Sequence, residues 1–139
     1  MKNIELKKLF DQTHTIAVIG MKIEEAEDAH RVPQYLYDQG FKIYPVNPKF
    51  TGQNALGEKF AAKVNEIKNN IDLVEIFRKP EFIPAHVKEI LTLNPLPKYV
   101  WFQLGIVNDE AAEKLRESGI VVVQDKCMLV EHRKLNLPD

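Results

Sequence analysis

The sequence predicts an α/β protein: a Rossmann-like, doubly wound parallel sheet of about five or six strands with helices on both faces. Short apolar runs alternate along the chain with segments of helical periodicity. Most of these runs are apolar at consecutive positions, which is typical of strands buried on both faces. A parallel sheet covered by crossover helices is the arrangement that buries such strands.

The expected strands follow the apolar runs in chain order. They occupy residues 16–19, 41–46, 71–77, 99–102 and 120–123. The run at 41–46 alternates and contains Pro45, and the run at 71–77 is interrupted by Asp72 and Glu75. The five runs are bounded by turn residues, as strands of this length usually are.

Helical patterns lie before, between and after these runs. They comprise IELKKLF near the N-terminus, the face formed by Val32, Tyr35 and Leu36, the face formed by Val87, Ile90 and Leu91, and the segments Asn108–Gly119 and Met128–Lys134. Gly40 and Gly119 suit the C-terminal ends of two of these helices, Pro84 suits a first turn, and Asn108 is a good N-cap. The segment 47–70 is rich in Asn, Pro, Gly and Lys, so it predicts a loop with a short edge strand near 56–59 and a short helix near 61–67.

Composition and charge exclude several classes of protein. The 139 residues suit one domain, 1–139, and Lys plus Arg (19) nearly balance Asp plus Glu (20). A net charge of −1 offers no broad basic surface, so we expect neither nucleic acid nor membrane as a partner. The N-terminal MKNIELKKLFDQ lacks the apolar core of a secretory signal, and the single cysteine suits a reducing compartment. These features predict a cytoplasmic protein.

The turn after the first strand lacks the usual dinucleotide fingerprint. A G-x-G-x-x-G turn and an acid about 20 residues later hold the pyrophosphate and ribose of NAD. Here Gly20 is followed by Met21 and Lys22, and the second strand ends in Val46-Asn47-Pro48 without an acid. Both departures argue against NAD, and Gly20 by itself is equally well explained as a residue that allows a turn between strand and helix.

The other strand ends favour a phosphorylated ligand. The carboxyl ends of parallel strands meet at one edge of a sheet, where ligands bind. Two segments, Asn47-Pro48-Lys49 and Phe77-Arg78-Lys79-Pro80, bring amide, cationic and aromatic side chains to that edge. Gln103-Leu104-Gly105 adds another amide and a residue without a side chain. A flat ring, an amide and several cations fit a phosphorylated adenine-type ligand, although a lone Arg-Lys pair is more often a solvated surface.

Five segments, taken in order, resemble a known family. The segments IAVIG, YPVNP, IDLVEIFRKPE, VWFQLGI and DKCMLVEHRKL resemble the small, free-standing CoA-binding domain proteins. These proteins are similar to the CoA-binding Rossmann domain of the succinyl-CoA synthetase α subunit and of ADP-forming acyl-CoA synthetases. The resemblance covers about residues 10–135 and implies that coenzyme A lies extended across the strand ends.

The resemblance also implies which residues contact coenzyme A or acyl-CoA. They are Gly20, Met21 and Lys22 near the phosphates; Val46, Asn47, Pro48 and Lys49 at the adenosine end; Phe77 and Arg78 beside the pyrophosphate and pantetheine; and Gln103 and Gly105 along the pantetheine. Cys127 follows the last strand, so we add it to this cofactor-binding set, although a free cysteine is more often a buried packing residue.

The sequence favours a binding module without catalytic residues. It contains no G-x-S-x-G, paired-carboxylate or metal-ligand pattern, and its four histidines are scattered, with His30 expected at the surface. The leading function is therefore a non-catalytic CoA-binding module. The alternatives are a Rossmann oxidoreductase that uses NAD(P), and an interaction domain that has lost its ligand because the acidic loop Glu24–Asp28 would repel a phosphate. The oligomeric state is left open.

Overall fold

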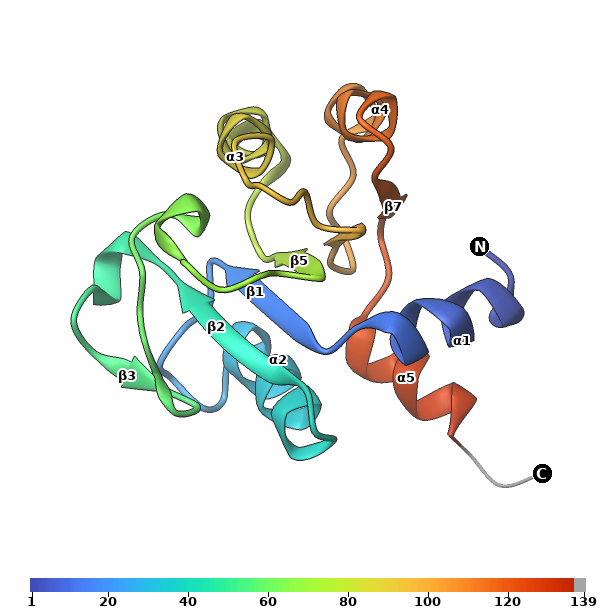
Figure 1. Ribbon diagram of the computed structural model, residues 1–139. Helices are drawn as coiled ribbons and strands as arrows, with labels where there is room; N and C mark the ends of the chain where they lie inside the picture. Colours follow the sequence, from blue (N-terminus) through green and yellow to red (C-terminus); the bar gives the residue numbers. More distant parts are fainter. Residues whose placement is uncertain (137–139) are drawn as a thin grey trace.

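The computed structural model describes residues 1–136, and it confirms the predicted Rossmann-like α/β fold (Figure 1). Five parallel strands form the sheet in the order β2-β1-β5-β6-β7. Their bounds are β1 Thr15–Ile19, β2 Lys42–Val46, β5 Leu73–Ile76, β6 Tyr99–Phe102 and β7 Val121–Val123. The chain leaves β1 towards β2 and returns to β5 on the other side of β1, which makes the β1–β5 junction the topological switch point.

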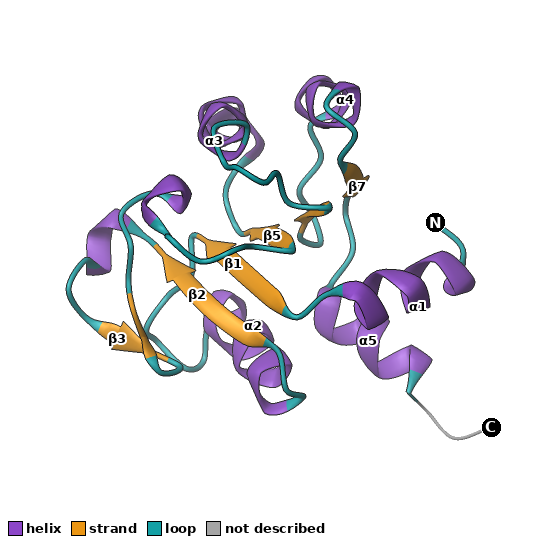
Figure 2. Cartoon of the chain, in the orientation of Figure 1, coloured by secondary structure: helices purple, strands orange, loops and turns teal. Residues whose placement is uncertain are grey.

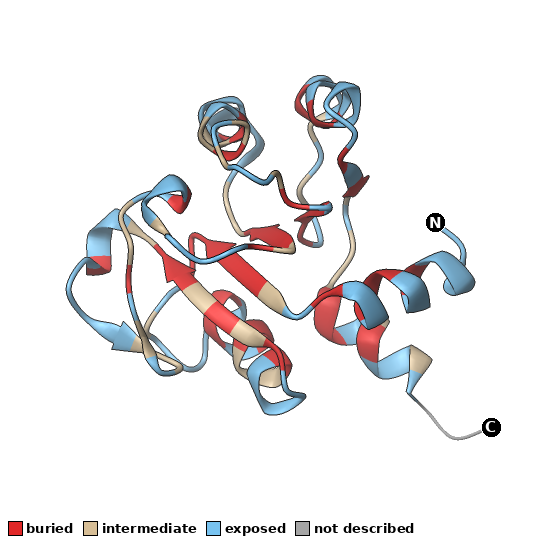
Figure 3. Ribbon diagram, in the orientation of Figure 1, coloured by how far each residue is buried: buried red, intermediate tan, exposed pale blue. Residues whose placement is uncertain are grey.

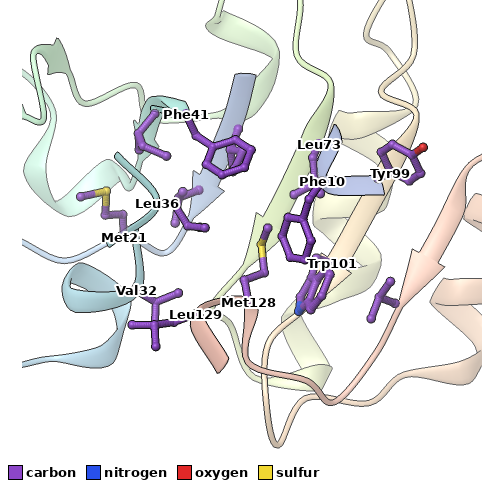
Figure 4. Close-up of a cluster of buried hydrophobic side chains, with 14 of the residues drawn as sticks. Phe10, Met21, Val32, Leu36, Phe41, Leu73, Tyr99, Trp101, Met128 and Leu129 are labelled. Carbon is purple, nitrogen blue, oxygen red and sulfur yellow. The ribbon is translucent and has the colours of Figure 1, made fainter. Parts of the chain in front are cut away.

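Helices cover both faces of the sheet, as the doubly wound prediction requires (Figure 2). One face carries α1 Asn3–Gln12, α2 Asp28–Asp38 and α5 Met128–Leu135, and the other carries α3 Ile83–Ile90 and α4 Asp109–Glu117. All four residues of β5 and of β6 are buried (Figure 3). On the first face, Trp101 packs against Phe10 with ring centroids 5.8 Å apart (Figure 4).

Pro45 is tolerated because β2 is an edge strand. The neighbouring Asn47 N–H donates to the Ala61 carbonyl at 2.9 Å, and the Ala61 N–H donates to the Pro45 carbonyl at 3.0 Å. The backbone at Pro45 therefore faces away from β1, and its missing N–H removes no bond between β1 and β2.

The segment after β2 differs from its prediction. The expected strand near 56–59 is not part of the main sheet: β3 Asn54–Ala55 and β4 Glu58–Lys59 form a separate antiparallel hairpin. Leu56 and Gly57 have φ of 52° and 87°, the left-handed conformation that a two-residue hairpin turn requires. The expected helix near 61–67 is only a 3₁₀ turn, Val64–Glu66, whose Glu66 carboxylate accepts the N–H groups of Ala62 and Lys63.

Glu75 is a carboxyl group buried in the middle of the sheet. It lies on β5, aligned with Val18 of β1 and Trp101 of β6, and it is 0% exposed. Neither of its carboxyl oxygens has a hydrogen-bond partner among residues 1–136. Burial disfavours the charged form and raises the pKa of Glu75 from 4.5 to about 8. At neutral pH the folded protein therefore holds Glu75 as a neutral acid.

This raised pKa predicts that the protein loses stability as the pH rises. The unfolded chain releases the proton near pH 4.5 and the folded chain near 8, so the unfolding free energy falls by about 1.4 kcal/mol per pH unit between these values. Urea unfolding from pH 5 to 8.5 measures this slope. Glu75→Gln should remove it, whereas Glu113→Gln, at an exposed position of α4, should retain it. An unchanged slope in Glu75→Gln would show that Glu75 does not cause it.

Candidate functional site

Two cavities meet at the carboxyl ends of the strands. The larger, which we call the cleft, has a volume of about 640 Å³ and lies beside the ends of β5 and β6. The smaller, which we call the recess, has a volume of about 170 Å³ and lies beside the ends of β1 and β2. Arg78 lines both cavities, so the two are neighbours along the edge where the fold predicts a ligand.

Most of the residues expected to contact a ligand line one of these cavities. The expected residues that line the cleft are Lys22, Phe77, Arg78, Gln103, Gly105 and Cys127. Those that line the recess are Gly20, Val46, Asn47, Pro48 and again Arg78. Two expected residues line neither cavity. The Met21 side chain is fully buried in the core (Figure 4), and Lys49 places its Nζ 5.7 Å from the centroid of the Phe50 ring.

Gly20 is explained by close packing at the switch point. Its φ is +84°, and a Cβ atom there would lie 2.4 Å from the Phe77 carbonyl oxygen. The Gly20 N–H donates to the Val46 carbonyl at 2.8 Å, and the Phe77 N–H donates to the Ile19 carbonyl at 2.9 Å. One glycine therefore lets the end of β1 join the ends of both neighbouring strands.

Hydrogen bonds hold the loop between β1 and α2 in place. The Asn47 Nδ2 donates to the Met21 carbonyl at 3.0 Å, and the Lys22 N–H donates to the Ala29 carbonyl at 3.2 Å. The Nδ1 of His30 lies 2.8 Å from the Lys22 carbonyl oxygen and donates to it. The expectation of a surface position for His30 is wrong: the residue is buried, because its ring closes this loop from the first turn of α2.

Two of the four acids in the loop Glu24–Asp28 pair with cations, and the other two do not line the cleft. All four carboxylates are on exposed residues, and only Glu27 and Asp28 line the cleft. Glu27 lies 3.9 Å from the Lys22 Nζ, and Asp28 lies 2.7 Å from an Arg31 nitrogen. These pairs are exposed, so each contributes little stability, but each offsets a negative charge beside the cleft.

Arg78 is held at the junction of the cleft and the recess. Its guanidinium carbon lies 4.4 Å from the centroid of the Phe82 ring, in cation–π contact. Its Cδ lies 3.3 Å from where a Cβ of Gly20 would be, so the stem of the side chain crosses the glycine. Its Nε is buried without a hydrogen-bond partner among residues 1–136. Lys79 also lines the cleft, so two cations follow β5.

Hydrogen bonds between main chain and side chains shape the far end of the cleft. The Gln103 Oε1 accepts the N–H of Met128, the first residue of α5, at 3.3 Å. The Gly105 N–H donates to the Asp125 carboxylate at 2.7 Å. Cys127 is partly buried at the N-cap position of α5 and lines the cleft. The amide of Gln103 therefore positions α5 in addition to lining the cleft.

Several residues that line these cavities were not among the expected contacts. Lys79, Pro80 and Ile106 in the cleft belong to the strand-end segments where a site was expected, whereas Lys63, His86 and Glu89 in the recess lie outside these segments. His86 and Glu89 are three residues apart on a predicted helix, and that spacing places two side chains on one face. Lys63 lies in a segment without a periodic pattern, so nothing in the sequence pointed to it.

Two structural features are absent from residues 1–136. No three or more His, Cys, Asp or Glu side chains in that range are grouped so that they could hold a metal ion. In the same part of the chain, no helix combines the length and apolar character needed to cross a membrane.

The packing at Gly20 predicts a large effect of one added methyl group. Gly20→Ala should lower the unfolding free energy by at least about 2 kcal/mol, because it adds backbone strain and displaces the Phe77 carbonyl. Gly52→Ala is the matched control, since Gly52 has a similar φ of +87° and no atom within 4 Å of an added Cβ. Denaturant unfolding of both variants measures the difference. If both variants lose the same unfolding free energy, the close approach of Gly20 to the Phe77 carbonyl does not limit the size of the residue at position 20.

Comparisons with known proteins agree with the fold of the chain. The chain is 37% identical over 128 residues to "Uncharacterized protein YneT" of Bacillus subtilis (strain 168), covering 92% of each chain. It matches the structure of cell-free ID.343 from Thermus thermophilus with a TM-score of 0.93 and 40% identity, covering 97% of this chain and 99% of that one. A hypothetical protein from Pyrococcus horikoshii OT3 matches with a TM-score of 0.90 and 32% identity, covering 97% and 92%. Residues 14–133 match the family model described as the CoA binding domain, and the chain therefore belongs to the CoA-binding domain family.

Proposed function

We propose that this protein binds coenzyme A, or an acyl-CoA, across the recess and the cleft, as a module without catalytic residues. The observation that carries the proposal is the position of Arg78, which lines both cavities and is held between Gly20 and Phe82. An arginine suits a phosphate through its planar fork of donors. A ligand with phosphates at its middle and different groups at its two ends suits a cation at such a junction.

Coenzyme A has that shape. Its adenine and 3′-phosphorylated ribose form one end, its pyrophosphate lies in the middle, and its pantetheine arm ends in a thiol. The recess is lined in part by apolar residues and suits the adenine end. Arg78, Lys22 and Lys79 suit the phosphates, and the segment from Gln103 to Gly105 suits the arm. The family membership of the chain independently supports this class of ligand.

The alternative of an NAD(P)-dependent oxidoreductase has less support. The ribose clamp of such enzymes is an acid at the end of the second strand, where this chain has Asn47. Both polar atoms of the Asn47 side chain are hydrogen-bonded to the main chain. Oδ1 accepts the Lys49 N–H at 3.0 Å, and Nδ2 donates to the Met21 carbonyl at 3.0 Å. Asn47 therefore acts as a brace between two loops and does not take over the role of that acid.

A binding role also suits the distribution of reactive side chains. His86 and Glu89 form an imidazole–carboxylate pair in the recess, whereas the cysteine thiol lines the cleft. Nucleophilic catalysis requires the base within hydrogen-bond reach of the nucleophile. No hydrogen bond joins Cys127 to a histidine among residues 1–136, so the two do not form such a pair.

Ligand-dependent thermal stability tests the proposal. A ligand at a hundredfold excess over its Kd stabilises the native state by about 2.7 kcal/mol, and each kcal/mol raises the Tm by roughly 3–5 °C for a domain of this size. Millimolar CoA should therefore raise the Tm by several degrees if Kd is about 10–100 μM or lower, and NAD should change it little. Arg78→Ala should weaken CoA binding at least tenfold, because it removes charge-assisted bonds to phosphate.

Arg116→Ala is the matched control for this variant, since Arg116 is an exposed residue of α4 that lines neither cavity. It should bind CoA as the parent does. A larger Tm shift with NAD or NADP than with CoA would favour the oxidoreductase instead. No shift with any of these ligands would favour an interaction domain that has lost its ligand. Unchanged CoA affinity in Arg78→Ala would show that the phosphates do not lie at the junction.

A further inference from the structure

The recess contains a histidine–carboxylate pair whose role the packing of the fold does not explain. His86 Nδ1 lies 3.1 Å from the Glu89 Oε1, and both residues line the recess. His86 Nε2 is buried and has no hydrogen-bond partner among residues 1–136. Arg78 also lines the recess, and its Nε is likewise buried without a hydrogen-bond partner among residues 1–136. Unsatisfied buried polar groups are rare in native proteins and call for an explanation.

We infer that His86, oriented by Glu89, selects the base that enters the recess, and that it accepts a 6-aminopurine and rejects a 6-oxopurine. This inference rests on the proposed binding of coenzyme A and assigns the discrimination of its adenine to a residue of this chain. Three features support this assignment: the size of the recess, the tautomer of His86, and the Nε–H donor of Arg78.

The recess has the size and lining for one flat ring system. Its volume of about 170 Å³ is close to that of an engineered protein cavity of roughly 150 Å³ that takes a benzene ring. Half of its lining is apolar: Ile19, Gly20, Val46, Pro48 and Ala62. A base fills such a space better than a phosphate does, because the charge of a phosphate loses its hydration against apolar walls.

Glu89 fixes which nitrogen of His86 carries the proton. An ionised carboxylate only accepts hydrogen bonds, so the Nδ1 that bonds to Glu89 is the N–H donor. In the neutral imidazole, Nε2 is then an acceptor. The exocyclic amino group of adenine is a donor and suits this atom, whereas the 6-oxo group of hypoxanthine is an acceptor and opposes it. Nε2 is shielded from solvent, so contact requires the imidazole to shift towards the recess.

Arg78 supplies the complementary group. Its Nε–H is a donor, and the ring nitrogens of adenine are acceptors. Arg78 Nε is shielded like His86 Nε2, so both side chains have to shift towards a bound base. One donor and one acceptor from these two side chains then match the alternation of acceptor and donor along an adenine edge. Discrimination of this kind is strong because the wrong base leaves buried polar groups of the site without partners.

The experiment compares three ligands by calorimetry at pH 8. The ligands are CoA, its deaminated analogue with hypoxanthine in place of adenine, and dephospho-CoA. The parent protein should prefer CoA to the deaminated analogue by at least tenfold at pH 8. His86→Phe keeps an aromatic ring without Nε2, and it should bind CoA and the analogue within twofold of each other. It should weaken CoA and dephospho-CoA by the same factor.

Two further variants separate positioning from folding. Glu89→Gln removes the carboxylate that fixes the tautomer, so the preference for adenine should fall partway, with the parent's Tm nearly retained. His14→Phe, at an exposed residue before β1 that lines neither cavity, should retain the parent's preference. A Tm measured for every variant shows that each one is folded at the temperature of the titration.

The outcomes distinguish this inference from the proposed function. If CoA and the deaminated analogue bind the parent equally at pH 8, the inference is overturned and CoA binding stands. If His86→Phe weakens CoA but not dephospho-CoA, His86 contacts the 3′-phosphate and the inference is also overturned. If the parent binds neither CoA nor dephospho-CoA at millimolar concentration, both the inference and the proposed function are overturned.

Discussion

The close approach of Gly20 to the Phe77 carbonyl is the constraint on which the site depends. At this point the ends of β1 and β5 come together, and β2 joins them through the bond from the Gly20 N–H to the Val46 carbonyl. The stem of Arg78 crosses the same glycine, so the packing that closes the sheet also positions the central cation. The recess and the cleft lie on the two sides of this junction. The position of the candidate binding edge therefore follows from how the strands meet rather than from a glycine-rich loop.

The fold could be predicted because its signals are local. Consecutive apolar residues at 99–102 became β6, buried at every position, and Asn108 caps α4 by accepting the Ala111 N–H at 3.0 Å. The segment after β2 could not be predicted in the same way. Its 3₁₀ turn is set by the Glu66 carboxylate, and its hairpin is set by positive φ angles at Leu56 and Gly57. Such features depend on single contacts and leave no periodic pattern in the sequence.

The site was predictable in its location and less so in its details. Parallel strands bring their carboxyl ends to one edge, so the residues that follow each strand could be grouped without coordinates. Whether a side chain faces the cavity is a different matter: Met21 turns into the core, although it lies between Gly20 and Lys22. The compensation of Asp28 by Arg31 and the pairing of His86 with Glu89 depend on side-chain geometry along helices. The buried Glu75 looked like an interruption of a strand and is instead a neutral acid within it.

The most direct test of the central claim is to map the binding of CoA on the protein by two-dimensional ¹⁵N–¹H NMR. The account predicts that titration with CoA shifts the backbone amides that follow β1, β5 and β6, above all those of Lys22, Arg78 and Gly105. Amides at the opposite ends of the same strands, such as that of Lys42, should keep their positions. Shifts confined to the groove beside β2, around Tyr44 and Lys59, would place the ligand elsewhere and contradict the account. Unchanged spectra at millimolar CoA would contradict CoA binding itself.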